Sequence, residues 1–423
     1  KAEYLKDGRT MWHDDFKGDV HTHYTSGTTT RNPYELPWDE WAYYKCFVEP
    51  NIMKMGLLRL SSGSRGLSFI SNQGIVGRAY KILSDTTDIT VDFPDTHELL
   101  TIEGVTEFFN NKENYNYDFI ASVPAIIIRF TELALQAGFD PKDLNISNII
   151  SGLGNFLTDS HIEYFHKYWK PKQIVESAGK AEVHSSVGGI RYSEIQPTCE
   201  PGFIHYSPMS NYTTQVDEGK RKLLLMTRLG GEGVASFVND AADFGVVKYF
   251  TVDSPCSCGS QLPAYKLLGR RDKAPGLKFG AMIYPAEIGV TLQAASKAIS
   301  IPIELGPKLR AQVVIVRGKT EADYDFINWI IGAPLEELTE EELTKVKQIV
   351  SEYPQYSYRL NAFTTKHLAL TEAGQGYLID SKFLPHVGRD KPAFPLVITT
   401  NINKENDNQS TMERYILELK ENA

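Results

Sequence analysis

Apolar residues along the chain form short continuous runs that alternate with stretches of helical spacing. The continuous runs predict strands at residues 146–150, 173–175, 222–228 and 311–317. Helices are predicted at residues 126–137, 159–169 and 339–350. The first of these helices is predicted to place Ile127, Phe130, Leu133 and Leu135 near one face. Because the strands alternate with helices, the pattern predicts an α/β fold with βαβ units.

Characteristic residues mark the ends of two of these helices. The sequence Gly-Phe-Asp-Pro at residues 138–141 ends the first helix, because neither Gly nor Pro supports its continuation. Thr339 and Glu342 have the spacing of a capping box at the start of the last helix. The apolar stripe of that helix consists of Leu343, Val346 and Val350. Residues 401–411 are polar and are predicted to form a loop.

A change in composition follows residues 269–273 of the 423-residue chain, and the domain boundary is predicted after Arg271. A chain of this length accommodates about two or three domains. Residues 1–271 hold most of the alternating strands and helices, and we expect them to form a large N-terminal α/β domain with mixed sheets and helices. Residues 272–423 are expected to form a smaller α+β C-terminal domain.

Bulk composition argues against several classes of protein. The net charge of −9 disfavours a general nucleic-acid surface. No apolar run reaches the length of a membrane span, and Arg129 ends the run at residues 125–128. The first residues lack the apolar core of a signal peptide, and four cysteines do not suggest a disulfide scaffold. We therefore expect a cytoplasmic protein without nucleic-acid or membrane partners.

A hydroxyl-rich segment carries the strongest indication of function. Residues 24–33 have the sequence Tyr-Thr-Ser-Gly-Thr-Thr-Thr-Arg-Asn-Pro. Such a segment offers backbone N–H groups and short O–H donors to a polyphosphate, and Gly27 lets the main chain approach closely. It is not a Walker loop, because no Gly-Lys-Ser/Thr follows at the required spacing. The residues alone leave a Ser/Thr-rich surface turn as the alternative.

The order Tyr-Thr-Ser-Gly-Thr-Thr, followed by Pro33, resembles the phosphate loop of adenylate-forming enzymes. Three further segments are similar to the phenylacetate-CoA ligase branch of that superfamily. Residues 124–144 resemble its Pro-initiated helix followed by Gly-x-Asp-Pro and Leu, and residues 151–158 occupy the place of its Gly-Gly-Glu-Pro-Trp-Thr element. Residues 175–183 look like its Asp-x-Tyr-Gly-x-Ser-Glu-Val motif. The resemblance covers approximately residues 24–288.

The resemblance implies that ATP activates a small carboxylic acid to an acyl-adenylate with release of pyrophosphate. Because two anions must meet, the site has to neutralise charge, and Mg²⁺ suits this task. Glu182 matches the family's metal-binding, catalytic Glu, and Glu176 matches the acidic residue that accepts from the adenine amine. The residues expected to bind ATP are Thr25, Ser26, Gly27, Thr28, Thr29, Thr30, Arg31, Gly154, Glu176, Ser177, Ala178, Gly179, Asp243 and Arg270.

The last part of the resemblance concerns the ribose and the mobile C-terminal domain. Asp243 is expected to accept hydrogen bonds from the ribose hydroxyls, with Asp240 as the competing candidate. Arg270 in the sequence Gly-Arg-Arg-Asp is expected to contact ribose or phosphate as a planar fork donor. Its alternative is a surface salt bridge. Asp272 and Lys273 would form the hinge about which the C-terminal domain turns.

The family's C-terminal domain carries a lysine that bridges the carboxylate and the α-phosphate. Residues 385–391 approximate its sequence context, so Lys391 is the expected catalytic lysine and Lys366 is its rival. Coenzyme A is the expected acceptor, with a carrier-protein thiol or an amine as the alternative. The assembly state is open, with a homodimer among the alternatives.

Three positions depart from the family pattern. Thr30 stands in place of a Gly, Ala178 in place of an aromatic residue, and Ala181 in place of a Ser or Thr. The loss of the aromatic ring suggests a roomier acid pocket and hence an aryl or bulky acid. The same departures fit a different class, a nucleotide-binding regulatory protein that has lost turnover.

Three cysteines and one histidine form a set of their own. Cys199, His205, Cys256 and Cys258 supply three thiols and one imidazole, which is a standard tetrahedral zinc set. Their spacing resembles elements found in part of the phenylacetate-CoA ligase branch. A zinc ion there would be structural, because no coordination position stays open. Ordinary buried thiols and a surface histidine are the alternative.

Overall fold

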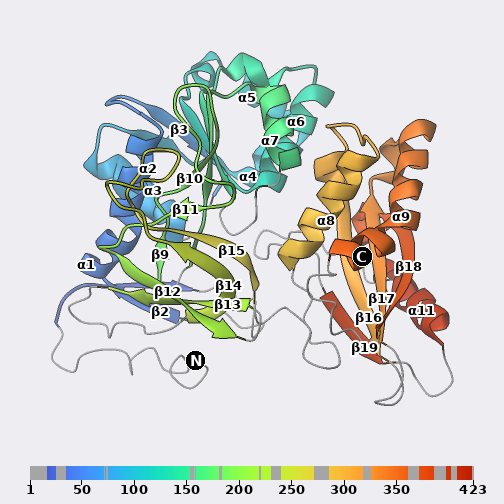
Figure 1. Cartoon of the computed structure of the whole chain (residues 1–423). Helices are drawn as coiled ribbons and strands as arrows, with labels where there is room; N and C mark the ends of the chain where they lie inside the picture. Colours follow the sequence, from blue (N-terminus) through green and yellow to red (C-terminus); the bar gives the residue numbers. More distant parts are fainter. Residues whose placement is uncertain are drawn as a thin grey trace. The chain divides into compact units, whose positions relative to one another are not determined.

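The computed structural model divides the chain into two compact units, coloured along the sequence in Figure 1. Unit 1 comprises Lys1–Leu157 and Phe165–Leu267, and unit 2 comprises Thr158–Tyr164 and Leu268–Ala423. The structure describes residues 17–24, 35–70, 72, 75–152, 157, 159–180, 183–218, 221–229, 240–270, 285–317, 325–360, 371–384, 397–401 and 407–421. The predicted boundary after residue 271 lies outside these ranges and stays a prediction.

A six-stranded sheet forms the centre of unit 1, with the strand order β10-β7-β6-β5-β3-β4. Its strands are β3 (Arg65–Ser68), β4 (Thr90–Asp92), β5 (Phe119–Ala121), β6 (Asn148–Gly152), β7 (Gln173–Ser177) and β10 (Gly189–Ser193). All neighbouring pairs are parallel except β10 with β7. Every residue of β5, β6 and β7 is buried, as expected for a parallel sheet covered on both faces.

Helices connect these parallel strands, as crossover geometry requires. They are α3 (Ile75–Thr86), α4 (Thr96–Leu99), α5 (Ile102–Asn110), α6 (Pro124–Gln136) and α7 (Asp159–Trp169), with short 3₁₀ turns η3 (Lys112–Tyr115) and η4 (Pro141–Leu144). The chain passes from β3 to β4 on one side and then returns to β5 on the other side of β3. In open sheets of this kind, ligands bind at the carboxyl edge near such a reversal.

Most predicted elements of unit 1 are confirmed, with ends shifted by a few residues. The helix predicted at residues 159–169 coincides with α7, and the one predicted at residues 126–137 is α6, which begins at a proline. Gly138 follows α6 with a φ of 85°, a left-handed conformation that glycine adopts without strain at a helix end. The strand predicted at residues 146–150 is β6, which begins two residues later.

The first two described strands of unit 1 form a hairpin. Strand β1 (Val20–Tyr24) pairs antiparallel with β2 (Glu35–Asp39), so that Tyr24 lies opposite Glu35. The hydroxyl-rich residues 25–34 therefore connect two paired strands, although their own placement lies outside the described residues. A nearly continuous helical stretch follows, formed by α1 (Glu40–Tyr43), the π-helix η2 (Tyr44–Val48) and α2 (Glu49–Leu57).

A second, five-stranded sheet in unit 1 has the order β11-β15-β14-β13-β12. Its strands are β11 (Ile204–His205), β12 (Asn211–Glu218), β13 (Arg221–Arg228), β14 (Asp240–Lys248) and β15 (Ala264–Arg270). The strand predicted at residues 222–228 is β13. A small hairpin of β8 (Gly179–Lys180) and β9 (His184–Ser185) follows β7.

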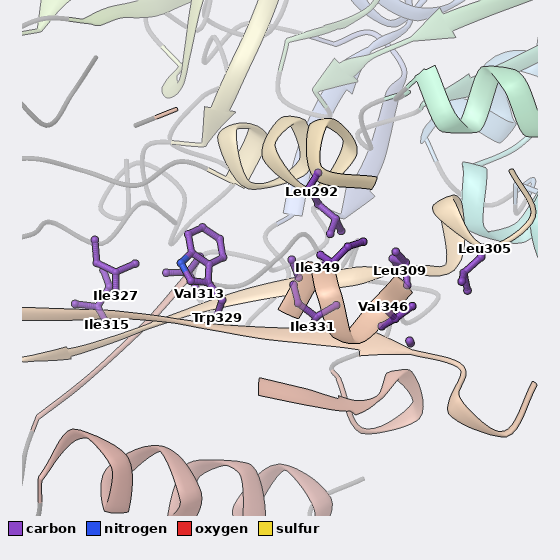
Figure 2. Close-up of a cluster of buried hydrophobic side chains, with 13 residues drawn as sticks. Leu292, Leu305, Leu309, Val313, Ile315, Ile327, Trp329, Ile331, Val346 and Ile349 are labelled. Carbon is purple, nitrogen blue, oxygen red and sulfur yellow. The ribbon is translucent and has the colours of Figure 1, made fainter. Parts of the chain in front are cut away.

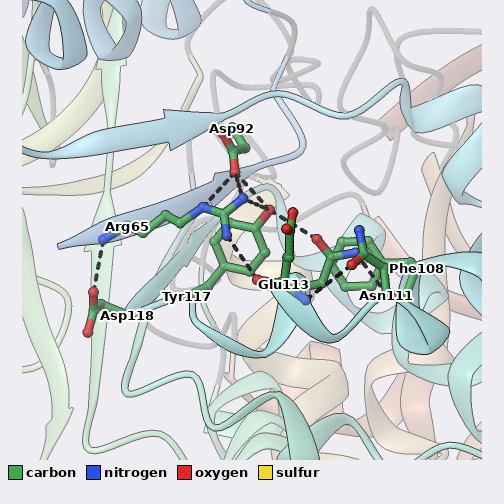
Figure 3. Close-up of polar contacts among 8 residues, drawn as sticks. Arg65, Asp92, Phe108, Asn111, Glu113, Tyr117 and Asp118 are labelled. Carbon is green, nitrogen blue, oxygen red and sulfur yellow. Dashed lines mark hydrogen bonds and ion pairs between the residues drawn. The ribbon is translucent and has the colours of Figure 1, made fainter. Parts of the chain in front are cut away.

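Arg65 organises the amino-terminal end of β3, at the edge of the sheet opposite to the carboxyl ends (Figure 3). Its guanidinium pairs with Asp92 on β4 and lies 4.4 Å from the centre of the Tyr117 ring. Its backbone N–H donates to Asp118 at 2.9 Å, and Nη1 donates to the Glu113 carbonyl at 2.9 Å. These contacts tie the edge strand β4 and η3 to the centre of the sheet, which is a structural role.

Unit 2 is a four-stranded mixed sheet with the order β18-β17-β16-β19. Its strands are β16 (Arg310–Arg317), β17 (Asp325–Ala333), β18 (Thr371–Asp380) and β19 (Val397–Asn401). Its helices are α8 (Pro285–Ala298), α9 (Glu340–Leu360) and α11 (Asn408–Glu421), with short turns η7 (Gly306–Lys308), η8 (Leu335–Glu337) and η9 (Ser381–Phe383). None of the described helices combines the length and apolar character that crossing a bilayer requires.

Each face of the unit 2 sheet has its own core. Alternate residues such as Val313 and Ile315 pack with Leu292 of α8 and Ile349 of α9 (Figure 2). The intervening residues, such as Val314, pack against α11 on the other face. Side chains alternate between the faces of a strand, so one strand serves both cores. The strand predicted at residues 311–317 is thereby confirmed as β16.

Two predictions for unit 2 need correction. The helix predicted to end at residue 350 continues to Leu360. The polar segment at residues 401–411 is not a loop throughout, because α11 begins at Asn408. Helix α11 has a polar first turn, and its apolar stripe of Met412, Tyr415, Ile416 and Leu419, which packs on the sheet, begins only after the segment predicted as a loop.

Candidate functional site

Two of the sequence motifs begin side by side at the carboxyl edge of the parallel sheet. Strands β6 and β7 are paired so that Ser151 lies opposite Glu176 and Gly152 opposite Ser177. The segments at residues 151–158 and 175–183 therefore leave the sheet at adjacent points. Only their order could be read along the chain; the register of the two parallel strands brings them together.

Glu176 occupies a buried, fully engaged position in this edge. Its side chain is 4% exposed, and it forms an ion pair with Arg191 of β10. One carboxylate oxygen accepts from the Leu157 N–H at 3.1 Å, and Arg191 donates to the Leu157 carbonyl at 3.1 Å. Burial raises the pKa of Glu176, and the neighbouring Arg191 opposes that rise. This pair clamps both backbone groups of Leu157, and its predicted contact with adenine stays a prediction.

Ser177, Ala178 and Gly179 continue the motif into β8. The Ser177 hydroxyl accepts from Lys54 Nζ at 2.8 Å, and the Ala178 N–H donates to Ser186 Oγ at 2.9 Å. Ala178 is 6% exposed and packs in a hydrophobic cluster with residues such as Ile204. The roomier acid pocket inferred from Ala178 stays a prediction.

The structure does not test the other predicted nucleotide contacts. Asp243 and Asp240 lie on β14, opposite Leu224 and Met226 of β13, and Arg270 is the last residue of β15. The placement of these three side chains lies outside what the structure describes. The same holds for the whole of Thr25–Arg31, Gly154, Glu182, Asp272, Lys273, Lys366 and Lys391.

The predicted Cys/His set does come together. The ligand atoms of Cys199, His205, Cys256 and Cys258 all lie within 4.8 Å of one another. They come from the loop after β10, from β11 and from the turn before β15. Residues 53 positions apart thus meet directly, with His205 Nε2 at 3.3 Å from Cys258 Sγ.

The donor geometry of this cluster fits a metal. His205 Nδ1 donates to the Leu262 carbonyl at 2.8 Å, which leaves Nε2 free to ligate, the usual arrangement behind a metal-bound histidine. The Cys199 thiol and His205 hold the pKa of Cys258 at about 4, which favours a thiolate. Three sulfur atoms and one imidazole nitrogen match a closed tetrahedral zinc site.

Sequence reasoning missed Lys54, which donates to the Ser177 hydroxyl from inside the protein. Its side chain is 0% exposed on α2. The sequence signal for its burial was its position next to Met55 and three residues after Asn51. Both of these residues lie on the buried face of α2, and Met55 packs in the hydrophobic core of unit 1. A lysine on the buried face of a helix is unusual unless it is paired.

No protein-family model and no curated protein sequence matches this chain. Solved structures do match. 2-Hydroxyisobutyryl-CoA ligase in its postadenylation state superposes with a TM-score of 0.61 at 13% identity, over 94% of this chain and 76% of that chain. The same ligase in an open conformation, with 2-HIB-AMP and CoA, gives a TM-score of 0.51 at 14% identity, over 89% and 74%.

O-succinylbenzoate coenzyme A synthetase from Bacillus subtilis, in complex with AMP, gives a TM-score of 0.50 at 14% identity, over 91% of this chain and 68% of that chain. These likenesses extend over most of the chain. The chain therefore shares the fold of these two CoA ligases, and the predicted α/β fold class is confirmed.

Proposed function

We propose that this protein is an AMP-forming acid–CoA ligase. ATP and a carboxylic acid give an acyl-adenylate and pyrophosphate, and a thiol such as that of coenzyme A then displaces AMP to give a thioester. One observation carries the proposal: the two segments that resemble motifs of this superfamily leave adjacent strands at the carboxyl edge of the parallel sheet. The fold around that sheet matches the fold of an acid–CoA ligase. Ligands bind at that edge in open α/β sheets.

The proposal assigns a role to each motif. Residues 25–31, in the connection between β1 and β2, hold the triphosphate, and Glu182 holds Mg²⁺. Asp243, with Asp240 as the competing candidate, accepts hydrogen bonds from the ribose, and Arg270 contacts ribose or phosphate. Lys391 bridges the carboxylate and the α-phosphate while the C-terminal domain, turning at Asp272 and Lys273, closes the site.

The substrate and acceptor classes follow from the motif departures and from the neighbours. Ala178 in place of an aromatic residue favours an aryl or bulky acid. Coenzyme A is the proposed acceptor, since a neighbouring ligase is solved with 2-HIB-AMP and CoA. A carrier-protein thiol or an amine is the alternative acceptor. The cytoplasmic location and a homodimer stay predictions from the sequence.

ATP–pyrophosphate exchange across a panel of acids, with Mg²⁺ present, tests this function. We expect exchange with at least one aryl or bulky acid. Glu182→Gln should lower that exchange by about 10²-fold or more, because it removes a charge that holds the metal at the reacting phosphates. Glu107→Gln, at an exposed position of α5, is the matched control and should leave the rate unchanged.

Two outcomes oppose this proposal in different ways. MgATP binding without exchange for any acid would favour the nucleotide-binding regulatory protein, which the residues Thr30, Ala178 and Ala181 also fit. Absence of both binding and exchange would remove the proposal altogether.

We also propose a structural zinc ion held by Cys199, His205, Cys256 and Cys258. Four protein ligands leave no open position, so the ion would join the loop after β10 to the turn before β15 without touching substrate. Metal analysis of the purified protein should find about one zinc per chain. A strong chelator should lower the melting temperature.

Cysteine variants sharpen this metal test. Cys256→Ser should lose the zinc, whereas Cys46→Ala should retain it, because Cys46 is buried elsewhere and donates to the Ser210 carbonyl at 3.4 Å. The zinc proposal would be contradicted by a wild-type protein that contains no metal and whose melting temperature does not change when the chelator is added.

A further inference from the structure

Lys54 is a buried basic residue to which the proposed function assigns no role. Its Nζ donates to Asn51 Oδ1 at 2.9 Å and to Ser177 Oγ at 2.8 Å. Among the described residues, no acidic side chain lies close enough to offset its burial. Desolvation penalises an isolated ammonium, so burial favours the neutral amine form of Lys54.

Lys54 contacts the uncharged groups of Asn51, Ser177 and Tyr80. Asn51 presents its amide oxygen from the same helix, α2. Tyr80 of α3 places its ring centre 6.0 Å from Nζ, and its buried hydroxyl has no hydrogen-bond partner within the described parts of the chain. Ser177 at the end of β7 accepts from Lys54 Nζ, and Ser186 after β9 lies beside Ser177.

Burial lowers the pKa of Lys54 to about 7. Near neutral pH the side chain is therefore divided between amine and ammonium. Both forms can donate to Ser177, but only the ammonium carries a charge. An added negative charge nearby favours the ammonium and raises this pKa.

Hydrogen bonds connect Lys54 to the motif backbone. The Ser177 hydroxyl lies 3.5 Å from Ser186 Oγ, and Ser186 accepts from the Ala178 N–H at 2.9 Å. All of these groups are buried. Lys54 therefore orders the point where β7 ends at the carboxyl edge, within the segment at residues 176–179 that is proposed to meet the nucleotide.

We propose that Lys54 is a positioning residue that takes up a proton from solvent when an anionic nucleotide binds beside residues 176–179. The inference rests on the proposed function and deepens it. The ammonium fixes Ser177 and, through Ser186, the Ala178 N–H, and it adds a positive charge to this buried network. No covalent bond forms or breaks; one proton moves from water or buffer to Nζ.

This coupling gives nucleotide affinity a defined pH dependence. Below the pKa of the nucleotide-free protein the lysine already carries its proton, so binding takes up none. Above that pKa, binding requires proton uptake, and affinity falls by up to about tenfold per pH unit until the pKa of the complex is reached. The inference therefore predicts affinity that declines from about pH 7 upward.

Calorimetric titration with MgATP, in buffers of different ionisation enthalpy, counts the protons taken up. At about pH 8 the wild-type protein should take up a substantial fraction of one proton more than Lys54→Met, which has a similar length and cannot titrate. Lys54→Arg keeps a permanent charge and should bind without this extra uptake. Lys45→Met is the matched control, since half-buried Lys45 already pairs with Glu49, and it should match the wild type.

The outcomes separate the two proposals. Equal proton uptake by wild type and Lys54→Met, with both binding MgATP, would overturn the inference and leave the proposed function intact. No MgATP binding by the wild type would overturn both. If Lys54→Met does not fold, proton uptake by Lys54→Arg equal to that of the wild type would overturn the inference in the same way.

Discussion

At the scale of single residues, a buried ion pair holds the carboxyl edge of the unit 1 sheet together. Glu176 and Arg191 lie on neighbouring antiparallel strands, with side chains 4% and 12% exposed, and both bond to the backbone of Leu157. A charge buried this deeply is tolerated only while its partner is present. Glu176 therefore stabilises the edge before any ligand is considered.

Glu176→Ala should lower the free energy of unfolding by about 3–5 kcal/mol, because it leaves Arg191 buried without its partner. Glu200→Ala breaks a pair with Lys248 that is 35% and 46% exposed, and it should cost about 1 kcal/mol or less. Urea unfolding followed by circular dichroism measures both variants. An equal loss of the free energy of unfolding in the two variants would contradict the stabilising role of the Glu176–Arg191 pair.

Lys54 should also affect how the free energy of unfolding depends on pH. Its pKa of about 7 in the folded protein lies below the value of an exposed lysine, so between these values the unfolded chain binds more protons. The free energy of unfolding of the wild type should then rise with pH relative to Lys54→Met, by up to about 1.4 kcal/mol per pH unit above about pH 7. Urea titrations at several pH values measure this difference, and parallel pH profiles for the two proteins would contradict it.

At the scale of elements, local patterns predicted the boundaries that depend on neighbours a few residues away. The predicted capping box at the start of α9 is confirmed: the Thr339 N–H donates to Glu342 at 2.8 Å, and the Glu342 N–H donates to Thr339 Oγ1 at 3.3 Å. These hydrogen bonds with Thr339 lower the pKa of Glu342. The stabilising effect of Glu342 is therefore present above its unfolded pKa and is lost as the pH falls through its folded pKa.

Thr339→Ala should lower the stability of α9 by about 1 kcal/mol, because it removes the side-chain cap of the helix. Thr344→Ala is the control within the same helix. Its hydroxyl only donates back to the Glu340 carbonyl, so its loss should be neutral or slightly stabilising. Hydrogen exchange of α9 peptides compares the two variants; similar protection in both would exclude a working cap.

At the scale of the whole molecule, each unit has its own hydrophobic core. The cluster of residues between Leu292 and Ile349 belongs entirely to unit 2, and the cluster that contains Ile150 belongs entirely to unit 1. Stability in each unit is therefore expected to depend first on its own core.

Ile331→Ala, at a fully buried position of β17, should lower the local stability of unit 2 by about 2–5 kcal/mol. Ile150→Ala should do the same in unit 1. Hydrogen exchange resolved by peptides distinguishes the two, with lost protection confined to the unit that carries the substitution. Loss throughout the chain from either variant would show that the units unfold together.

The sequence by itself determined the features that depend on neighbouring residues: the buried strands, the helix cap at Thr339, the order of the motifs and the ligand types of the Cys/His set. Periodicity and capping are local, so they can be read along the chain. Helix α11 was not predicted, because its first turn is polar and its apolar stripe begins only at Met412.

Only the tertiary structure decided which distant groups meet. It paired β6 with β7, gave Glu176 its partner Arg191, and gathered four metal-ligand side chains into one cluster. It also removed water from Lys54, and the pKa of an amine depends on that loss of solvent rather than on its sequence neighbours. Contacts and desolvation arise from the packing of segments far apart in the chain, which no local pattern encodes.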